Sequence, residues 1–210
     1  MFIFYLHLVT YCWGDRHTDA MDATEFNELY DGLIVEPLES AGFTRRGSSL
    51  FLESGDEILA LLRFGKKSSG LLQRTYLIAC VRHRFLRELT DAVVPDEPPV
   101  TANDYPFKER PSRLSESFVA GWSYRPINLG VRSGDYDDVG FGEAKSVELV
   151  VEALRALADN MLSGGVKWLE RLTPQEALRQ LETNGEGAWC EKLWIADYRR
   201  RLSGNGGQAP

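Results

Sequence analysis

The chain contains little cysteine and little histidine, and this scarcity argues against several kinds of site. Each of the two residue types occurs three times in 210 residues. The cysteines are odd in number and form no CxxC pair, so we expect no disulfide framework and favour a reducing, cytoplasmic location. No spacing typical of metal ligands is present, and we expect neither a metal site nor a cofactor. The residues are Cys12, Cys80, Cys190, His7, His17 and His83.

Long apolar runs are also missing. The most apolar segment, residues 2–13, is shorter than the roughly twenty residues that span a bilayer. It lacks the basic start and the cleavage site of a signal peptide. We therefore interpret residues 1–20 as an N-terminal extension outside the domain, as a mis-assigned start would produce; a poor secretion signal is the alternative. Met21 then opens the domain, because Asp22 and Glu25 have the spacing of a helix capping box.

Positive charge is scarce overall. The net charge is −7 and the isoelectric point is near 5.1. Such a molecule is not drawn as a whole to nucleic acid or to anionic membranes, so we expect neither as a partner. A hydrophobic share of 43% over this length is enough for one core. We expect a single domain over residues 21–202, followed by a flexible tail at 203–210.

Sequence motifs of known chemistry are absent. There is no P-loop, GxSxG or HExxH motif. Residues 135–146 begin like a calcium loop, but the apolar Val139 stands at the fifth position, and Ser146 stands at the twelfth, where a bidentate glutamate is needed. We interpret this stretch as a solvated turn before a helix. Cys80, within an apolar strand, is expected to be a core residue rather than a nucleophile.

An apolar stripe predicts the first helix, over residues 24–41. Pro37 lacks an amide donor and crowds the preceding turn, so the helix should kink or restart near Glu36. Gly42 suits the left-handed position after the helix, and Phe43 can fold back onto the last turn. The stripe consists of Phe26, Leu29, Leu33 and Leu38.

Strands follow the first helix. A hairpin is expected around residues 54–56, and a long strand with apolar residues on both faces is expected in a central position. Residues 91–117 are rich in proline and acid and are either a lid or a long excursion between strands. The predicted strands cover residues 50–53, 57–64 and 72–85, with one or two more within 118–131.

The last third of the chain is helical. A helix over residues 147–161 should end at Gly164 and Gly165, and Thr173 followed by Pro174 starts another. A final helix covers residues 188–202. We predict an α+β fold: an antiparallel sheet of about four to five strands, with an N-terminal helix and several C-terminal helices packed on one face.

The chain resembles a bacterial family of domains of unknown function, the one catalogued as number 4304. The resemblance covers roughly residues 24–181 and rests on five features: the N-terminal helix from Phe26 to Leu38, Pro37-Leu38 before Gly42-Phe43, Arg45-Arg46-Gly47 entering a strand, the region of Trp122, and the helix that ends before Trp168-Leu169-Glu170. It implies a small soluble bacterial domain and carries no established catalytic residues. By analogy, some domains of this kind look like immunity proteins of toxin systems.

Basic residues are concentrated between Arg45 and Arg87, a segment that contains nine basic residues and only three acidic ones. Arg74, Arg82 and Arg84 share a strand face, and Arg63 could join them from the neighbouring strand. Such a patch can bind a phosphate or an acidic partner through guanidinium groups. The alternative is that these arginines pair with carboxylates of the same chain. The candidate binding residues are Arg45, Arg46, Arg63, Arg82, His83 and Arg84.

Three function classes remain open, and the least favoured is a stand-alone structural domain with no specific ligand. The first is a non-catalytic protein-interaction module, immunity-like by the analogy above, which uses the arginine-rich sheet face or the acidic helices. The second is an enzyme or small-ligand binder that acts on a phosphate-bearing anion at the arginine-rich face. In the second class His83 could serve catalysis; without an orienting carboxylate it is expected to be a surface residue.

Overall fold

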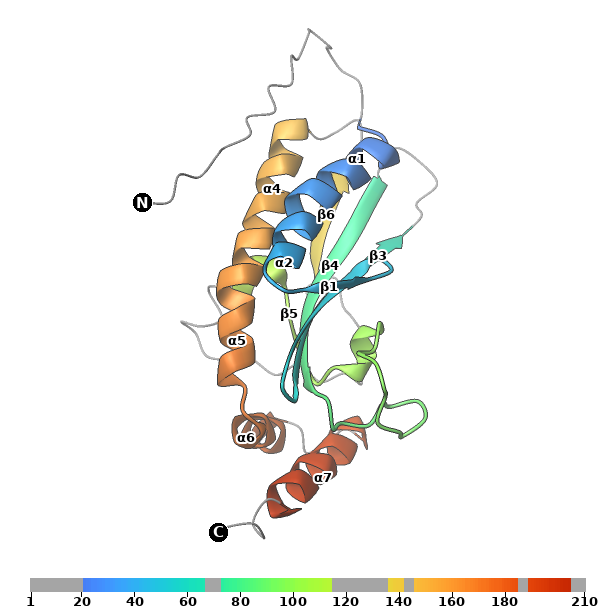
Figure 1. Cartoon of the computed structure of the whole chain (residues 1–210). Coiled ribbons are helices and arrows are strands. Elements are labelled where there is room, and N and C mark those ends of the chain that lie inside the picture. The colour runs from blue at the N-terminus through green and yellow to red at the C-terminus, as the bar shows by residue number, and fades with distance from the viewer. Residues whose placement is uncertain (1–20, 67–72, 115–135, 142–145, 185–188, 205–210) are drawn as a thin grey trace, which may run out of the picture.

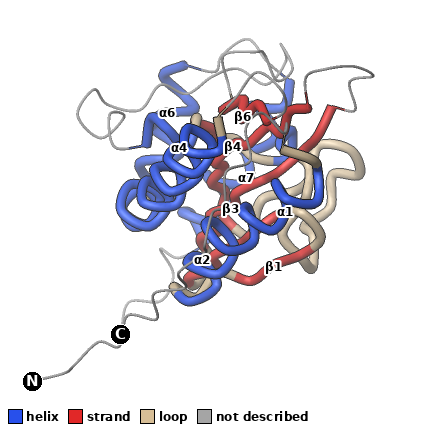
Figure 2. Tube along the Cα trace, turned by 90° about the horizontal axis from the view of Figure 1, so that it is seen from above, coloured by secondary structure: helices blue, strands red, loops and turns tan. Residues whose placement is uncertain are grey.

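A computed structural model describes residues 21–66, 73–114, 136–141, 146–184 and 189–204. Within these ranges a six-stranded antiparallel sheet packs against a layer of helices (Figures 1 and 2). The predicted α+β class is confirmed, with one strand more than expected. Among the helices in the same ranges, none is long and apolar enough to cross a membrane.

The elements follow the order expected from the sequence. The strands are β1 (Thr44–Arg46), β2 (Ser49–Ser54), β3 (Glu57–Lys66), β4 (Gln73–His83), β5 (Phe107–Glu109) and β6 (Asp137–Phe141). The N-terminal helical elements are α1 (Ala23–Tyr30), the π-helix η1 (Asp31–Val35) and α2 (Glu36–Ser40). The later ones are α4 (Val147–Asn160), the π-helix η5 (Met161–Gly165), α5 (Val166–Arg171), α6 (Pro174–Asn184) and α7 (Trp189–Gly204), besides the short 3-10 turns η2 (Ala102–Asp104) and η3 (Pro111–Arg113).

The predicted capping box starts α1. The Asp22 carboxylate accepts hydrogen bonds from the amides of Thr24 (2.6 Å) and Glu25 (2.9 Å), and the Glu25 carboxylate accepts one from the Asp22 amide (3.2 Å). The restart near Glu36 is also confirmed. Pro37 cannot continue the α-helical ladder, and the turn before it widens so that the Glu36 amide donates to the Asp31 carbonyl.

The end of α2 has the predicted glycine cap. Gly42 has a φ of +96°, and its amide donates to the Glu39 carbonyl over 2.9 Å. The Phe43 amide donates to the Leu38 carbonyl over 3.0 Å, which completes a Schellman motif. Phe43 is 4% exposed, so the same turn that ends the helix also places a ring in the core.

Substitution of Gly42 by Ala is expected to lower the free energy of unfolding by about 1 kcal/mol, because an L side chain is disfavoured at this φ. Gly42→Asn is the matched control, since asparagine tolerates the left-handed region better, and it should lose less. Urea denaturation of the three proteins measures the difference. Equal losses for Ala and Asn would contradict the conformational explanation.

Two short turns build the first half of the sheet. β1 and β2 are joined by Gly47-Ser48, and β2 and β3 by Gly55-Asp56; the glycine in each has a positive φ. A glycine at the first turn position is typical of tight hairpins. The second hairpin was predicted, whereas β1 was not recognised as a strand of its own because it has only three residues.

β4 lies in the centre of the sheet, as predicted. It pairs with β3 along one edge, and with β5 and β6 along the other. Leu59, Leu61, Leu77, Ala79 and Val81 point to the helices and form the helix-covered face. Ile58, Ala60, Leu62, Ile78 and Cys80 point the other way and form the loop-covered face. Cys80 is fully buried there, and burial raises the pKa of its thiol to about 12, so the core assignment is confirmed.

Residues 86–105 form the loop that covers the loop-covered face of the sheet. This loop returns across the sheet, and Tyr105 and Ala102 pack on the apolar residues of that face. The part of segment 91–117 that the structure describes is thus a long excursion that leads into β5 and then η3. The strands predicted within 118–131 lie outside the described residues.

The predicted solvated turn at residues 135–146 is wrong where the structure describes it, because β6 occupies this stretch. Asp137 is buried and accepts hydrogen bonds from the Ser112 hydroxyl (2.6 Å) and the Arg110 guanidinium (3.2 Å). Asp138 points to the opposite side and pairs with Arg74 at 2.6 Å. Adjacent acids on opposite faces of a strand cannot surround one ion.

The expectation that Gly164 and Gly165 end a helix is also wrong. The chain continues from α4 through η5 into α5, and both glycines are buried. A Cβ on Gly164 would lie 2.8 Å from the Cβ of Leu114, and one on Gly165 would lie 3.1 Å from Leu59. The glycines allow close packing here. The predicted start of the next helix is confirmed, because the Thr173 hydroxyl accepts from the Glu176 amide.

Candidate functional site

The two arginines of β1 point to opposite sides of the sheet, because successive side chains of a strand alternate. Arg45 pairs with Asp31 of η1 at 3.1 Å. Arg46 pairs with Glu53 of β2 at 3.1 Å and with Glu97 of the 86–105 loop at 3.4 Å. The two neighbours therefore cannot form one binding site.

Arg63 lies on the helix-covered face, since it is paired in register with Leu77, a residue of the helix-side core. Its guanidinium donates to Thr75 (3.0 Å) and Asn27 (2.6 Å) and lies 4.1 Å from the Tyr30 ring. Burial lowers the pKa of Arg63, and the contact with the ring favours its charge. Arg63 does not join the arginines of the opposite face, contrary to expectation.

Arg82 is fully buried on the loop-covered face. Its guanidinium donates to main-chain carbonyls: to that of Leu86, to that of Asp104 at 2.8 Å, and weakly to that of His83 at 3.4 Å. Burial lowers its pKa, while Tyr105 and Asp104 oppose the shift. A guanidinium already bonded to carbonyls at both ends of one loop acts as a structural anchor.

Arg84 and Arg46 are two predicted site residues that the fold brings to one side chain. Arg84 pairs with Glu53, the carboxylate that also holds Arg46. The two guanidiniums thus come together around a carboxylate of the same chain. An external anion would have to displace Glu53 to use both.

His83 lies on the helix-covered side and is buried, not exposed as expected. Its Nδ1 shares a 2.7 Å hydrogen bond with the hydroxyl of Tyr198 in α7. Burial lowers the pKa of His83 to about 4, against the opposing effect of the Asp56 carboxylate. The imidazole is therefore neutral near pH 7 and joins α7 to the end of β4. Arg87 strengthens this junction through its pair with Asp197 at 2.7 Å.

Acidic side chains gather on the N-terminal helices. Six acids and no lysine or arginine occur between Met21 and Phe43. Glu28, Glu36 and Glu39 are exposed and have no ion-pair partner among the described residues. The signal is visible in the sequence once charges are counted helix by helix.

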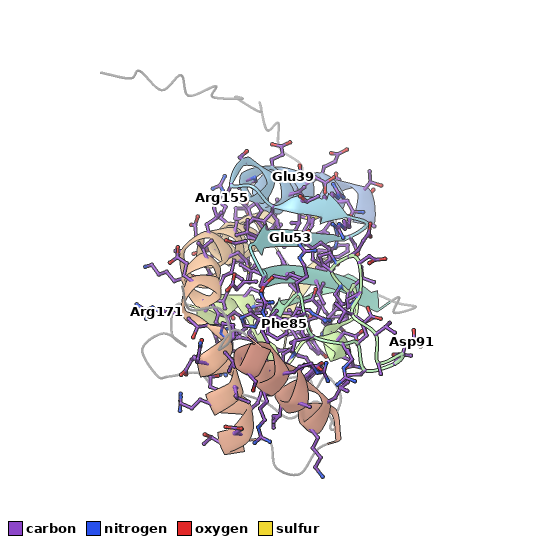
Figure 3. All side chains as sticks on the ribbon, turned by 60° about the horizontal axis from the view of Figure 1, so that its bottom comes forward. Glu39, Glu53, Phe85, Asp91, Arg155 and Arg171 are labelled. Atoms are coloured by element: carbon purple, nitrogen blue, oxygen red, sulfur yellow. The ribbon has the colours of Figure 1, made fainter. Side chains whose placement is uncertain are left out.

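α4 carries further exposed acidic side chains. It packs against η1, and Figure 1 shows it running beside α2. Glu148, Glu152 and Asp159 line a hollow along its outer side together with Arg155. Figure 3 shows Glu39 and Arg155 on the same end of the molecule. We call Glu28, Glu36, Glu39, Glu148, Glu152 and Asp159 the acidic helical face.

A metal centre has no basis in the part of the chain that the structure describes, where no group of three His, Cys, Asp or Glu side chains is placed to hold an ion. No family model matches the chain, and no curated protein or solved structure matches it either. The resemblance to the family of domains of unknown function therefore stays a prediction.

Proposed function

We propose that this protein is a non-catalytic interaction module that binds a basic protein partner through the acidic helical face. The observation that carries the proposal is the difference between the two charged surfaces. The arginines of the sheet are engaged by groups of the same chain, whereas three exposed carboxylates of α1 and α2 form no ion pair with any residue that the structure describes. Uncompensated charge on one surface steers a partner of opposite charge and favours its association.

An immunity-like role is the more specific form of this hypothesis. It predicts that the partner is harmful to the bacterium when this protein is missing. We place the interaction in the bacterial cytoplasm, where a free thiol such as that of Cys80 stays reduced. The alternative, an anion binder at the arginine-rich sheet face, is less favoured because Glu53 already occupies both Arg46 and Arg84.

The test compares charge reversals at two positions of the acidic helical face with one reversal elsewhere. Glu28→Lys and Glu39→Lys change the acidic helical face, and Glu170→Lys changes an exposed glutamate of α5 by the same charge. The partner is captured with the wild-type protein, purified, and titrated with each variant by calorimetry. Each reversal on the face should weaken binding by about tenfold, which corresponds to about 1.4 kcal/mol, and Glu170→Lys should have little effect.

The partner itself provides the second criterion. It should be basic, and its affinity should fall as the salt concentration rises. A neutral or acidic partner, or equal affinities for wild type, Glu39→Lys and Glu170→Lys, would refute the proposal. Thermal unfolding of the variants confirms that they remain folded.

A further inference from the structure

The 86–105 loop exposes apolar side chains that its own fold does not need. Val93, Val94 and Val100 are 55%, 50% and 65% exposed. They account for three of the five large hydrophobic residues that are exposed in the described parts of the chain. The loop lies on the side of the sheet away from α4 and α5, and Figure 3 shows Asp91 at its outer edge (Figures 1 and 3).

The base of this loop is held rigidly. The buried Arg82 guanidinium donates both to the Leu86 carbonyl at the start of the loop and to the Asp104 carbonyl near its end. The Asp104 carboxylate accepts from the Leu89 amide at 3.0 Å. One cation therefore closes the loop across about twenty residues of chain, and Asp104 links the two ends a second time.

The outer part of the loop is also ordered by hydrogen bonds. The Glu88 amide donates to the Val93 carbonyl (2.8 Å), and the Ala92 amide donates to the Glu88 carbonyl (3.1 Å). The Tyr105 hydroxyl donates to the Pro99 carbonyl (2.7 Å). These bonds hold the valines in place before any partner arrives, which reduces the entropy lost on binding.

Ala92 adds an independent observation. Its φ is +55°, and it is the one residue other than glycine with a positive φ in the described part of the chain. An alanine in this region is strained, and strained residues persist where the surroundings hold them and where the resulting geometry has a use. Here the strain turns the chain directly before Val93 and Val94.

The charge of the loop specifies its partner. Between Arg87 and Lys108 there are five acids and no lysine or arginine. Asp91 and Asp96 are exposed beside the valines. An apolar tip with a negative border fits an apolar pocket with a basic rim, and it is repelled by an anionic lipid surface.

We propose that the 86–105 loop is a preformed insertion element that places Val93 and Val94 in an apolar, basic-rimmed pocket of a protein partner. This surface is separate from the acidic helical face, so it does not depend on the proposed function. A partner could contact either surface alone.

Site-specific photo-crosslinking in living bacteria tests the proposal. A photoreactive amino acid replaces Val94 in one protein and Leu149 of α4, which is 56% exposed, in the control. Position 94 should give one discrete adduct with a basic protein, and position 149 should not give it. In a second experiment the photoreactive amino acid stands at position 100, so that Val93 and Val94 can be substituted. The double variant Val93→Ser/Val94→Ser should reduce the yield of the adduct at least about tenfold, whereas Leu149→Ser should leave the yield unchanged.

Hydrogen exchange of the free protein gives a readout that needs no partner. The amides of Glu88, Leu89 and Ala92 should exchange at least about tenfold more slowly than unprotected amides. Unprotected exchange there would overturn the preformed loop. Equal adducts from positions 94 and 149, no adduct from 94, or an adduct with a second copy of this acidic chain would overturn the proposed partner. An adduct that survives Glu28→Lys/Glu39→Lys separates this surface from the acidic helical face.

Discussion

Lowering the pH from 6.5 to 4 is expected to remove about 3 kcal/mol of stability through His83 alone. The imidazole has an ordinary pKa of 6.5 in the unfolded chain, and burial lowers its pKa to about 4 in the folded protein. Between these two pH values the imidazole is protonated in the unfolded chain but stays neutral in the folded protein. The contribution of His83 is therefore complete above pH 6.5, is lost as the pH falls, and is gone by about pH 4.

The measurement is urea denaturation of the wild type and of His83→Gln at several pH values. Glutamine keeps a polar group beside the Tyr198 hydroxyl but does not titrate. Carboxylates contribute to the pH dependence of both proteins, so the difference between the two curves isolates the histidine. This difference should change by about 3 kcal/mol across the range. Parallel curves would show that His83 is not held neutral by burial.

Gly164→Ala is expected to destabilise the protein by about 2 kcal/mol or more. The new methyl group would lie 2.8 Å from the Cβ of Leu114 and 3.0 Å from its carbonyl carbon. The carbonyl carbon is a backbone atom, so no change of side-chain rotamer can relieve this contact. η5 would have to move away from Leu114, which directly follows η3. Differential scanning calorimetry gives the loss as a lower unfolding temperature.

Gly32→Ala is the matched control, because Gly32 also lies in a π-helical turn, η1. A Cβ at this position meets no atom within 4 Å. Alanine there should raise stability by about 0.5–1 kcal/mol, since it favours helix and restricts the unfolded chain. Opposite signs for the two substitutions support close packing at Gly164. Equal signs would contradict it.

Local interactions explain where the sequence analysis succeeded. The capping box of Asp22, the restart at Pro37 and the glycine cap at Gly42 each depend on residues a few positions apart. The central position of β4 follows from apolar residues on both of its faces. Such patterns are readable without knowledge of the partner segments.

Long-range contacts explain where it failed. Gly164 and Gly165 have the usual appearance of a helix end, but Leu114 and Leu59 pack against them and the helix continues. Asp137 has the appearance of a solvated turn residue, but Ser112 and Arg110 stabilise it in a strand. In both cases the deciding atoms come from distant parts of the chain.

The same distinction applies to the candidate site. The sequence by itself determined the α+β class, the antiparallel sheet and the concentration of arginines between Arg45 and Arg87. Only the tertiary structure decided what those arginines do, because the register of β3 and β4 separates Arg63 from Arg82, and the returning loop brings its carbonyls to Arg82. Strand alternation is local, but the choice of partner for each charge depends on which segments the fold places across from it.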